Sequence, residues 1–220
     1  YNSGPHHDDI MLGIMPLTNR QLRPASNKVH FAVMTSGYNS VTNGFLRDSL
    51  KMTLDFLEED KIQMVHYPDF FEEGYKHKYD KDIYHYLDSV ASDNQYQMDR
   101  GFCHRLLRCS VRIWQFKNLE ELKAKYNEVI GVLERSYDGE KNTPDLQRLK
   151  GMIREFEEEL VWAYNGVPVK NVHHLHLGFY QDSGVTKGPN MERDVMPILN
   201  QFREIQPNII SVTLDPEGSG

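Results

Sequence analysis

The chain of 220 residues has the length of one large domain, so we expect a single hydrophobic core with room for an insertion. Hydrophobic residues make up 39% and charged residues 26%, and the mean hydropathy is −0.62. Because 10 Phe, 12 Tyr and 2 Trp can fill a core, disorder over most of the chain is excluded. The net charge of −7, without a long basic run, argues against a nucleic-acid partner.

Three features bear on the compartment of the protein. No apolar stretch approaches the roughly 18 residues that cross a bilayer, so no membrane span is expected. The chain opens at Tyr1 without a basic start, an apolar run or an initial Met, which predicts a fragment without a signal peptide. Cys103 and Cys109 stand in a helical-looking stretch, which predicts reduced core residues and a cytoplasmic protein.

The first 65 residues alternate between strand and helix patterns. Residues 27–36 (NKVHFAVMTS) have the β-branched and aromatic content of a buried strand. Residues 43–59 carry apolar side chains at helical spacing. Residues 60–100 mix Tyr, His and acidic residues without a persistent period, which predicts a long, partly ordered insertion.

Three helical segments follow, at residues 98–116, 119–137 and 146–163. The second and third each carry six apolar residues at alternating spacings of three and four. A breaker-rich stretch joins them, with Thr143 as the expected N-cap ahead of Pro144. This pattern predicts an antiparallel helical hairpin with a coiled-coil-like seam.

The last part of the chain returns to the α/β pattern. Residues 170–180 alternate like a strand, residues 191–205 are amphipathic, and residues 208–214 read as a strand. A strand, helix, strand succession predicts parallel pairing through right-handed crossovers. In such sheets the chemistry gathers at the carboxyl ends of the strands.

The densest group of chemically active side chains is the run Gly4-Pro5-His6-His7-Asp8-Asp9. Imidazole nitrogen and carboxylate oxygen are zinc ligands, and a turn lets His6 and Asp9 converge while Asp8 points elsewhere. A carboxylate that is not a ligand can accept the proton of an attacking water molecule. An exposed polar turn, or the remnant of an added tag, would explain the same residues without function.

The run PHHDDIMLG resembles the PHPDDE-type signature of the PIG-L/LmbE N-deacetylases, zinc hydrolases that remove acetyl groups from N-acetylglucosamine-type sugars. Further resemblances follow in family order: HFAVMTSGYNS, the helix containing REFE, NVHHLHLGFYQDSG and QPNIISVTLDPEG. They fall within residues 1–43 and 151–220. They are most similar to the LmbE-like domain fused behind glucosamine-6-phosphate deaminase-like proteins.

The resemblance implies one deacetylase domain over residues 1–220. Its expected fold is α/β, with a Rossmann-like, mostly parallel sheet flanked by helices and a long helical insertion. That insertion would span about residues 44–150 and include the helical hairpin at about 118–165.

Position by position, the resemblance implies that His6 and Asp9 are metal ligands and that Asp8 is the general base. His7 stands where the family usually has Pro, and Ile10 where it usually has an acidic residue. The third ligand of the family is a His that would come just after Gly220. The implied metal is Zn²⁺, although sites of His and Asp also accept iron, manganese or cobalt.

Five further residues are candidates for binding the substrate. Arg154 offers a guanidinium for a phosphate or a sugar hydroxyl, with an ion pair to a neighbouring acid as the structural alternative. Ser36 and Gly37 could offer backbone N–H groups at the end of a strand. Tyr180 and Asp182 also follow a strand.

The expected activity is therefore metal-dependent removal of an acetyl group from an amino-sugar substrate. Two alternatives stay open: a non-catalytic sugar-binding or regulatory module with an incomplete metal site, or the deacetylase-like part of a protein related to glucosamine-6-phosphate deaminase. The Tyr-rich insertion could also mediate self-association.

Overall fold

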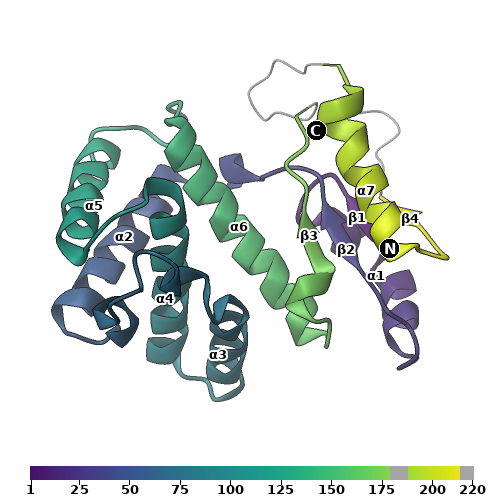
Figure 1. Cartoon of the computed structure of the whole chain (residues 1–220), viewed down its shortest axis with the longest axis horizontal. Coiled ribbons are helices and arrows are strands. Elements are labelled where there is room, and N and C mark those ends of the chain that lie inside the picture. Colours follow the sequence, from purple (N-terminus) through teal and green to yellow (C-terminus); the bar gives the residue numbers. More distant parts are fainter. Residues whose placement is uncertain (179–187, 214–220) are drawn as a thin grey trace. The chain divides into compact units, whose positions relative to one another are not determined.

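The computed structural model describes residues 1–178 and 188–213. The chain divides into two compact units (Figure 1). The sheet unit comprises Tyr1–Gly37 and Glu157–Gly220, and the helical unit comprises Tyr38–Phe156. One boundary between the units falls within the long helix α6 (Pro144–Tyr164).

The sheet unit holds four short parallel strands: β1 (Asn2–Gly4), β2 (Phe31–Val33), β3 (Val172–His174) and β4 (Ser211–Val212). Their order across the sheet is β3-β2-β1-β4, and every neighbouring pair in the described residues is parallel. Helix α1 (Asp9–Leu22) joins β1 to β2, and a π-helical turn (Met191–Val195) followed by α7 (Met196–Ile205) precedes β4. The predicted α/β fold with a parallel sheet is confirmed.

One face of this sheet packs against α1 and the end of α6. Phe31 of β2 and Trp162 of α6 are both 0% exposed, and their rings stack with centroids 3.7 Å apart. The Trp162 indole N–H donates to the carboxylate of buried Glu158, one turn earlier on α6. The same core cluster contains Ile10, Val29, Val167 and Val172.

The other face carries histidines and the aromatic side chains next to α7. His30 Nδ1 and His173 Nε2 lie 3.0 Å apart in a ring-to-ring hydrogen bond. Tyr1 stacks on His173 and meets Phe202 of α7 edge-on. Burial, followed by the nearby His30, lowers the pKa of His173 to about 4. These histidines therefore pack as neutral groups at pH 7.

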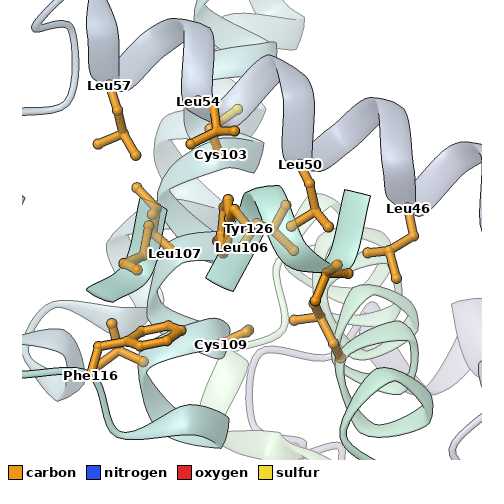
Figure 2. Close-up of a cluster of buried hydrophobic side chains, with 14 of the residues drawn as sticks. Leu46, Leu50, Leu54, Leu57, Cys103, Leu106, Leu107, Cys109, Phe116 and Tyr126 are labelled. Atoms are coloured by element: carbon orange, nitrogen blue, oxygen red, sulfur yellow. The ribbon is translucent and has the colours of Figure 1, made fainter. Parts of the chain in front are cut away.

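The helical unit contains α2 (Asn43–Glu58), α3 (Tyr79–Ala91), α4 (Gln95–Trp114), α5 (Leu119–Leu133) and the first part of α6. Four leucines of α2 project toward the side chains of α4, where Leu106 and Leu107 are almost completely buried (Figure 2). Helix α5 also packs against α2, and its Tyr126 hydroxyl hydrogen-bonds with Ser110 of α4 at 2.8 Å. The four leucines are Leu46, Leu50, Leu54 and Leu57.

Two local features predicted from the sequence, the N-cap at Thr143 and the state of the two cysteines, are present in the structure. The backbone N–H of Leu146 donates to Thr143 Oγ1 at 3.5 Å, and α6 begins at Pro144, so the predicted N-cap is confirmed. Cys103 and Cys109 are both buried and neither forms a disulfide bond, as predicted for reduced core residues. No helix in residues 1–178 or 188–213 is both long enough and apolar enough to span a membrane.

The expectation of a partly ordered stretch at residues 60–100 is wrong. This stretch contains 3₁₀ turns, α3 and the first residues of α4. Arg108 of α4 is buried, and its guanidinium donates to Asp82 of α3 at 2.8 Å and to the carbonyl oxygens of Tyr75 and His77. Because charged side chains occupy interior positions here, the apolar period that marks a helix is interrupted.

The predicted strands are also longer than the observed ones. Residues 27–36 contain only the three-residue β2, and residues 170–180 only β3. His176 has a left-handed φ of 49° and lies beyond β3, so it does not share a strand face with His174.

Candidate functional site

Because the strands are parallel, their carboxyl ends meet at one edge of the sheet. The segment that leaves β1 there is held by the end of β2: Met34 N–H donates to Gly4 O at 3.1 Å, and the Thr35 hydroxyl donates to Pro5 O at 2.8 Å. A Cβ at Gly4 would lie 2.8 Å from Oγ1 of Thr213, the residue after β4, so a larger residue at this position would displace its neighbours. Residues 5–8 then form a turn that leads directly into α1.

His6 and Asp9 converge within this turn. The His6 backbone N–H donates to Asp9 Oδ2 at 2.6 Å, and His6 Nδ1 lies 3.4 Å from the same oxygen. Each side chain is 32% exposed, so both remain open to solvent. Two ligand atoms at about 2.1 Å from one tetrahedral ion are about 3.4 Å apart, so this pair has the separation that a shared zinc ion requires.

The geometry supplies two candidate ligands and no third one in the described part of the chain. Within residues 1–178 and 188–213, no group of three or more His, Cys, Asp or Glu side chains could hold a metal ion. The third ligand predicted beyond Gly220 lies outside the sequence. The separation of His6 and Asp9 is compatible with two ligands of one ion, and their role as metal ligands stays a prediction.

Asp8 lies between these two residues and points to solvent. It is exposed and occupies the N-cap position of α1, but its side chain makes no capping hydrogen bond to the helix. Its carboxylate is therefore accessible to water and to substrate. The geometry is compatible with the predicted general base.

His7 has the opposite environment. It is only 4% exposed, and its ring stacks with that of His174 at the end of β3, with centroids 6.2 Å apart and an interplanar angle of 23°. His174 Nε2 lies 3.6 Å from Oε1 of Glu159, a buried residue of α6. Reasoning from the sequence treated His7 as a replacement of Pro and overlooked Glu159. The acidic run EEE ahead of an aromatic helix end is the signal that could have indicated a buried acid.

The predicted substrate-binding residues are placed as follows. Ser36 and Gly37 lie just past the end of β2, where Gly37 adopts a left-handed φ of 62° in a turn. Arg154 lies on α6 in the helical unit, whereas the other predicted site residues belong to the sheet unit. Tyr180 and Asp182 lie outside the described residues.

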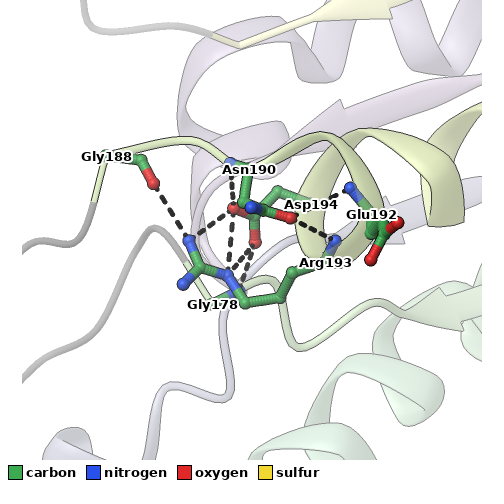
Figure 3. A network of polar contacts seen from close by, with 6 residues as sticks. All are labelled: Gly178, Gly188, Asn190, Glu192, Arg193 and Asp194. Atoms are coloured by element: carbon green, nitrogen blue, oxygen red, sulfur yellow. Dashed lines mark hydrogen bonds and ion pairs between the residues drawn. The ribbon is translucent and has the colours of Figure 1, made fainter.

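A second polar network that sequence reasoning missed surrounds Asp194, on either side of residues 179–187 (Figure 3). The Asp194 carboxylate accepts hydrogen bonds from the backbone N–H of Gly178 at 2.7 Å and of Asn190 at 2.8 Å. Arg193 also donates to it through Nε and Nη2, and this contact holds the pKa of Asp194 far below its usual range. Arg193 Nη2 donates further to Gly188 O. The network ties Gly178, which follows β3, to the π-helical turn that precedes α7.

Comparison with known proteins gives one partial relationship. The chain is 37% identical over 109 residues to a glucosamine-6-phosphate deaminase-like protein of Bacteroides thetaiotaomicron. The match covers 47% of this chain and 16% of that relative, so the chain spans a small part of the relative's length. No family model matches the chain. No solved structure matches it either.

Proposed function

We propose that this chain carries the active-site turn of a metal-dependent hydrolase that removes an acetyl group from an N-acetylated amino sugar. The observation that carries the proposal is the convergence of His6 and Asp9 at 3.4 Å, with the exposed Asp8 between them at the carboxyl end of β1. Parallel α/β sheets place their reactive groups at this edge. The resemblance of PHHDDIMLG to the PIG-L/LmbE signature supports the same assignment.

The amino-sugar substrate is supported by the relative. Its name refers to glucosamine-6-phosphate, a phosphorylated amino sugar, and the match covers 47% of this chain. An acetylated amino sugar presents an amide carbonyl as the group to be hydrolysed. Ser36 and Gly37 are the candidates for contacts to its hydroxyls or phosphate, and Arg154, Tyr180 and Asp182 remain candidates from the sequence.

The chemistry would divide between the three residues of the turn. His6 and Asp9 would hold the metal through Nδ1 and Oδ2, the two atoms whose separation fits a shared ion. Zinc supplies polarisation of a carbonyl group and of water when it is bound in such a site. Asp8 would accept the proton of the attacking water and return it to the nitrogen of the leaving amine, so that water and amide become acetate and a free amine.

Acetate release from a panel of N-acetylated sugars, with and without a 6-phosphate, tests this proposal. Zinc-loaded wild-type protein is expected to release acetate. Asp8→Asn keeps the shape of the side chain and should retain the metal while losing turnover by roughly 10²–10⁴-fold. Near-normal turnover of Asp8→Asn would show that Asp8 is not the base. Saturable sugar binding without acetate release would contradict the hydrolase and support the sugar-binding module.

A further inference from the structure

Beneath the solvent-facing turn lies a row of three side chains: the buried His7 and Glu159, and the partly buried His174. We propose that Glu159 and His174 are positioning residues that hold the turn between the two candidate metal ligands, through the ring of His7. The inference rests on the proposed function, because the ligands it concerns are His6 and Asp9. It adds two residues, from β3 and α6, to a site that the sequence placed on one turn.

The first step is the position of His7 in the turn. Its neighbours His6 and Asp8 reach solvent, whereas only 4% of His7 is exposed. The backbone ahead of the turn is held by hydrogen bonds from β2, and the backbone after it enters α1. The inward ring of His7 therefore anchors the middle of the turn, where the spacing of the ligands is set.

The second step is what the ring of His7 packs against. His174 pairs in register with Val33 of β2, and Leu175 N–H continues that ladder by donating to Val33 O at 2.9 Å. The backbone of His174 is thus fixed to the sheet. Its ring stacks with that of His7 at a centroid separation of 6.2 Å, so a displacement of one ring displaces the other.

The third step is the carboxylate behind His174. Glu159 is 6% exposed, and its Oε1 lies 3.6 Å from His174 Nε2. A carboxylate at this distance favours hydrogen on Nε2 and so restricts the orientation of the imidazole ring. In metal sites, a carboxylate that orients a ligating histidine is typically worth about 10–100-fold in metal affinity. Here the carboxylate would act one residue further away, on the histidine that packs against the turn.

The test is a Co²⁺ titration followed by visible absorption, because cobalt binds zinc-type sites and reports their geometry. Glu159→Gln keeps the size of the side chain and removes its charge, and it should weaken Co²⁺ binding about 10-fold or more and alter the cobalt spectrum. Glu192→Gln is the matched control, because it removes an exposed charge from the same unit. The melting temperature of the metal-free variants should stay close to that of the wild type.

The outcomes separate this inference from the proposed function. If the wild type binds Co²⁺ and Glu159→Gln binds it with the same affinity and the same cobalt spectrum, the inference is overturned and the proposed metal site stays in place. A lower melting temperature with unchanged affinity would likewise assign Glu159 a structural role only. If Glu159→Gln does not fold, His174→Gln is measured in its place with the same expectation. A wild-type protein that binds no Co²⁺ would overturn the proposed function and this inference together.

Discussion

Leu133, the last residue of α5, should contribute far more to stability than its neighbour Val132. Leu133 is 3% exposed and belongs to the main core cluster, whereas Val132 is 42% exposed. Leu133→Ala removes buried methyl groups and leaves a cavity among α2, α4 and α5, which costs about 3 kcal/mol. Val132→Ala removes mostly solvated groups and should stay within about 0.5 kcal/mol of neutral. The two substitutions shorten adjacent residues of one helix, so they differ mainly in burial.

The measurement is the thermal and urea unfolding of both variants by circular dichroism. A loss of about 3 kcal/mol corresponds to a decrease of roughly 6–12 °C in melting temperature for a chain of this size. Leu133→Asp and Phe156→Asp should be more destabilising still, because each also buries a charge; Phe156 is 1% exposed. Equal melting of Leu133→Ala and Val132→Ala would refute the packing of α5 described above.

Two further predictions concern stability. A Cβ at Gly178 would lie 2.3 Å from Cδ of Arg193, so Gly178→Ala should displace Arg193 from Asp194 and lower the melting temperature. Gly188→Ala is the control and should not lower it, because a Cβ there meets no atom of the described residues within 4 Å. Burial lowers the pKa of His104 from 6.5, the value expected in the unfolded chain, to about 4. The contribution of neutral His104 to the free energy of unfolding is therefore present above pH 6.5 and is lost as the pH falls toward 4. Because of this group, the free energy of unfolding in urea should fall by roughly 2–3 kcal/mol between pH 7 and pH 4.5, and the decrease should be smaller in His104→Asn. A variant with the same pH dependence as the wild type would contradict the lowered pKa of His104.

The parts of the fold that the sequence predicts are those with a local pattern. The apolar spacing of α2, α4, α5 and α6 identifies these helices, and the alternation of strand and helix predicts parallel pairing, which the register of β1, β2 and β3 confirms. The position of the His6–Asp9 turn at the end of β1 follows from the same alternation. A local pattern is sufficient to identify these helices and strands, because each of them buries one face and so repeats its apolar residues at a regular spacing.

The parts that the sequence does not predict depend on contacts between distant residues. The strand ends are set by pairing rather than by composition, which is why β2 has three residues within a run of ten. Arg108 and Asp82 neutralise each other inside the helical unit and so hide the period of α3. His174 and Glu159 join His7 through the sheet, over more than 150 residues of sequence, and no local spacing encodes that contact.

The central claim is that His6 and Asp9 hold a metal ion, and zinc binding tests it most directly. Equilibrium dialysis against Zn²⁺ should be compared for the wild type, His6→Ala and His66→Ala. His66 is a matched control, because its side chain is 53% exposed and its Nε2 also lies close to a carboxylate oxygen, that of Asp60 at 2.7 Å. The account predicts that His6→Ala weakens zinc binding by about 10-fold or more while His66→Ala binds like the wild type. Equal zinc binding by all three proteins would contradict it.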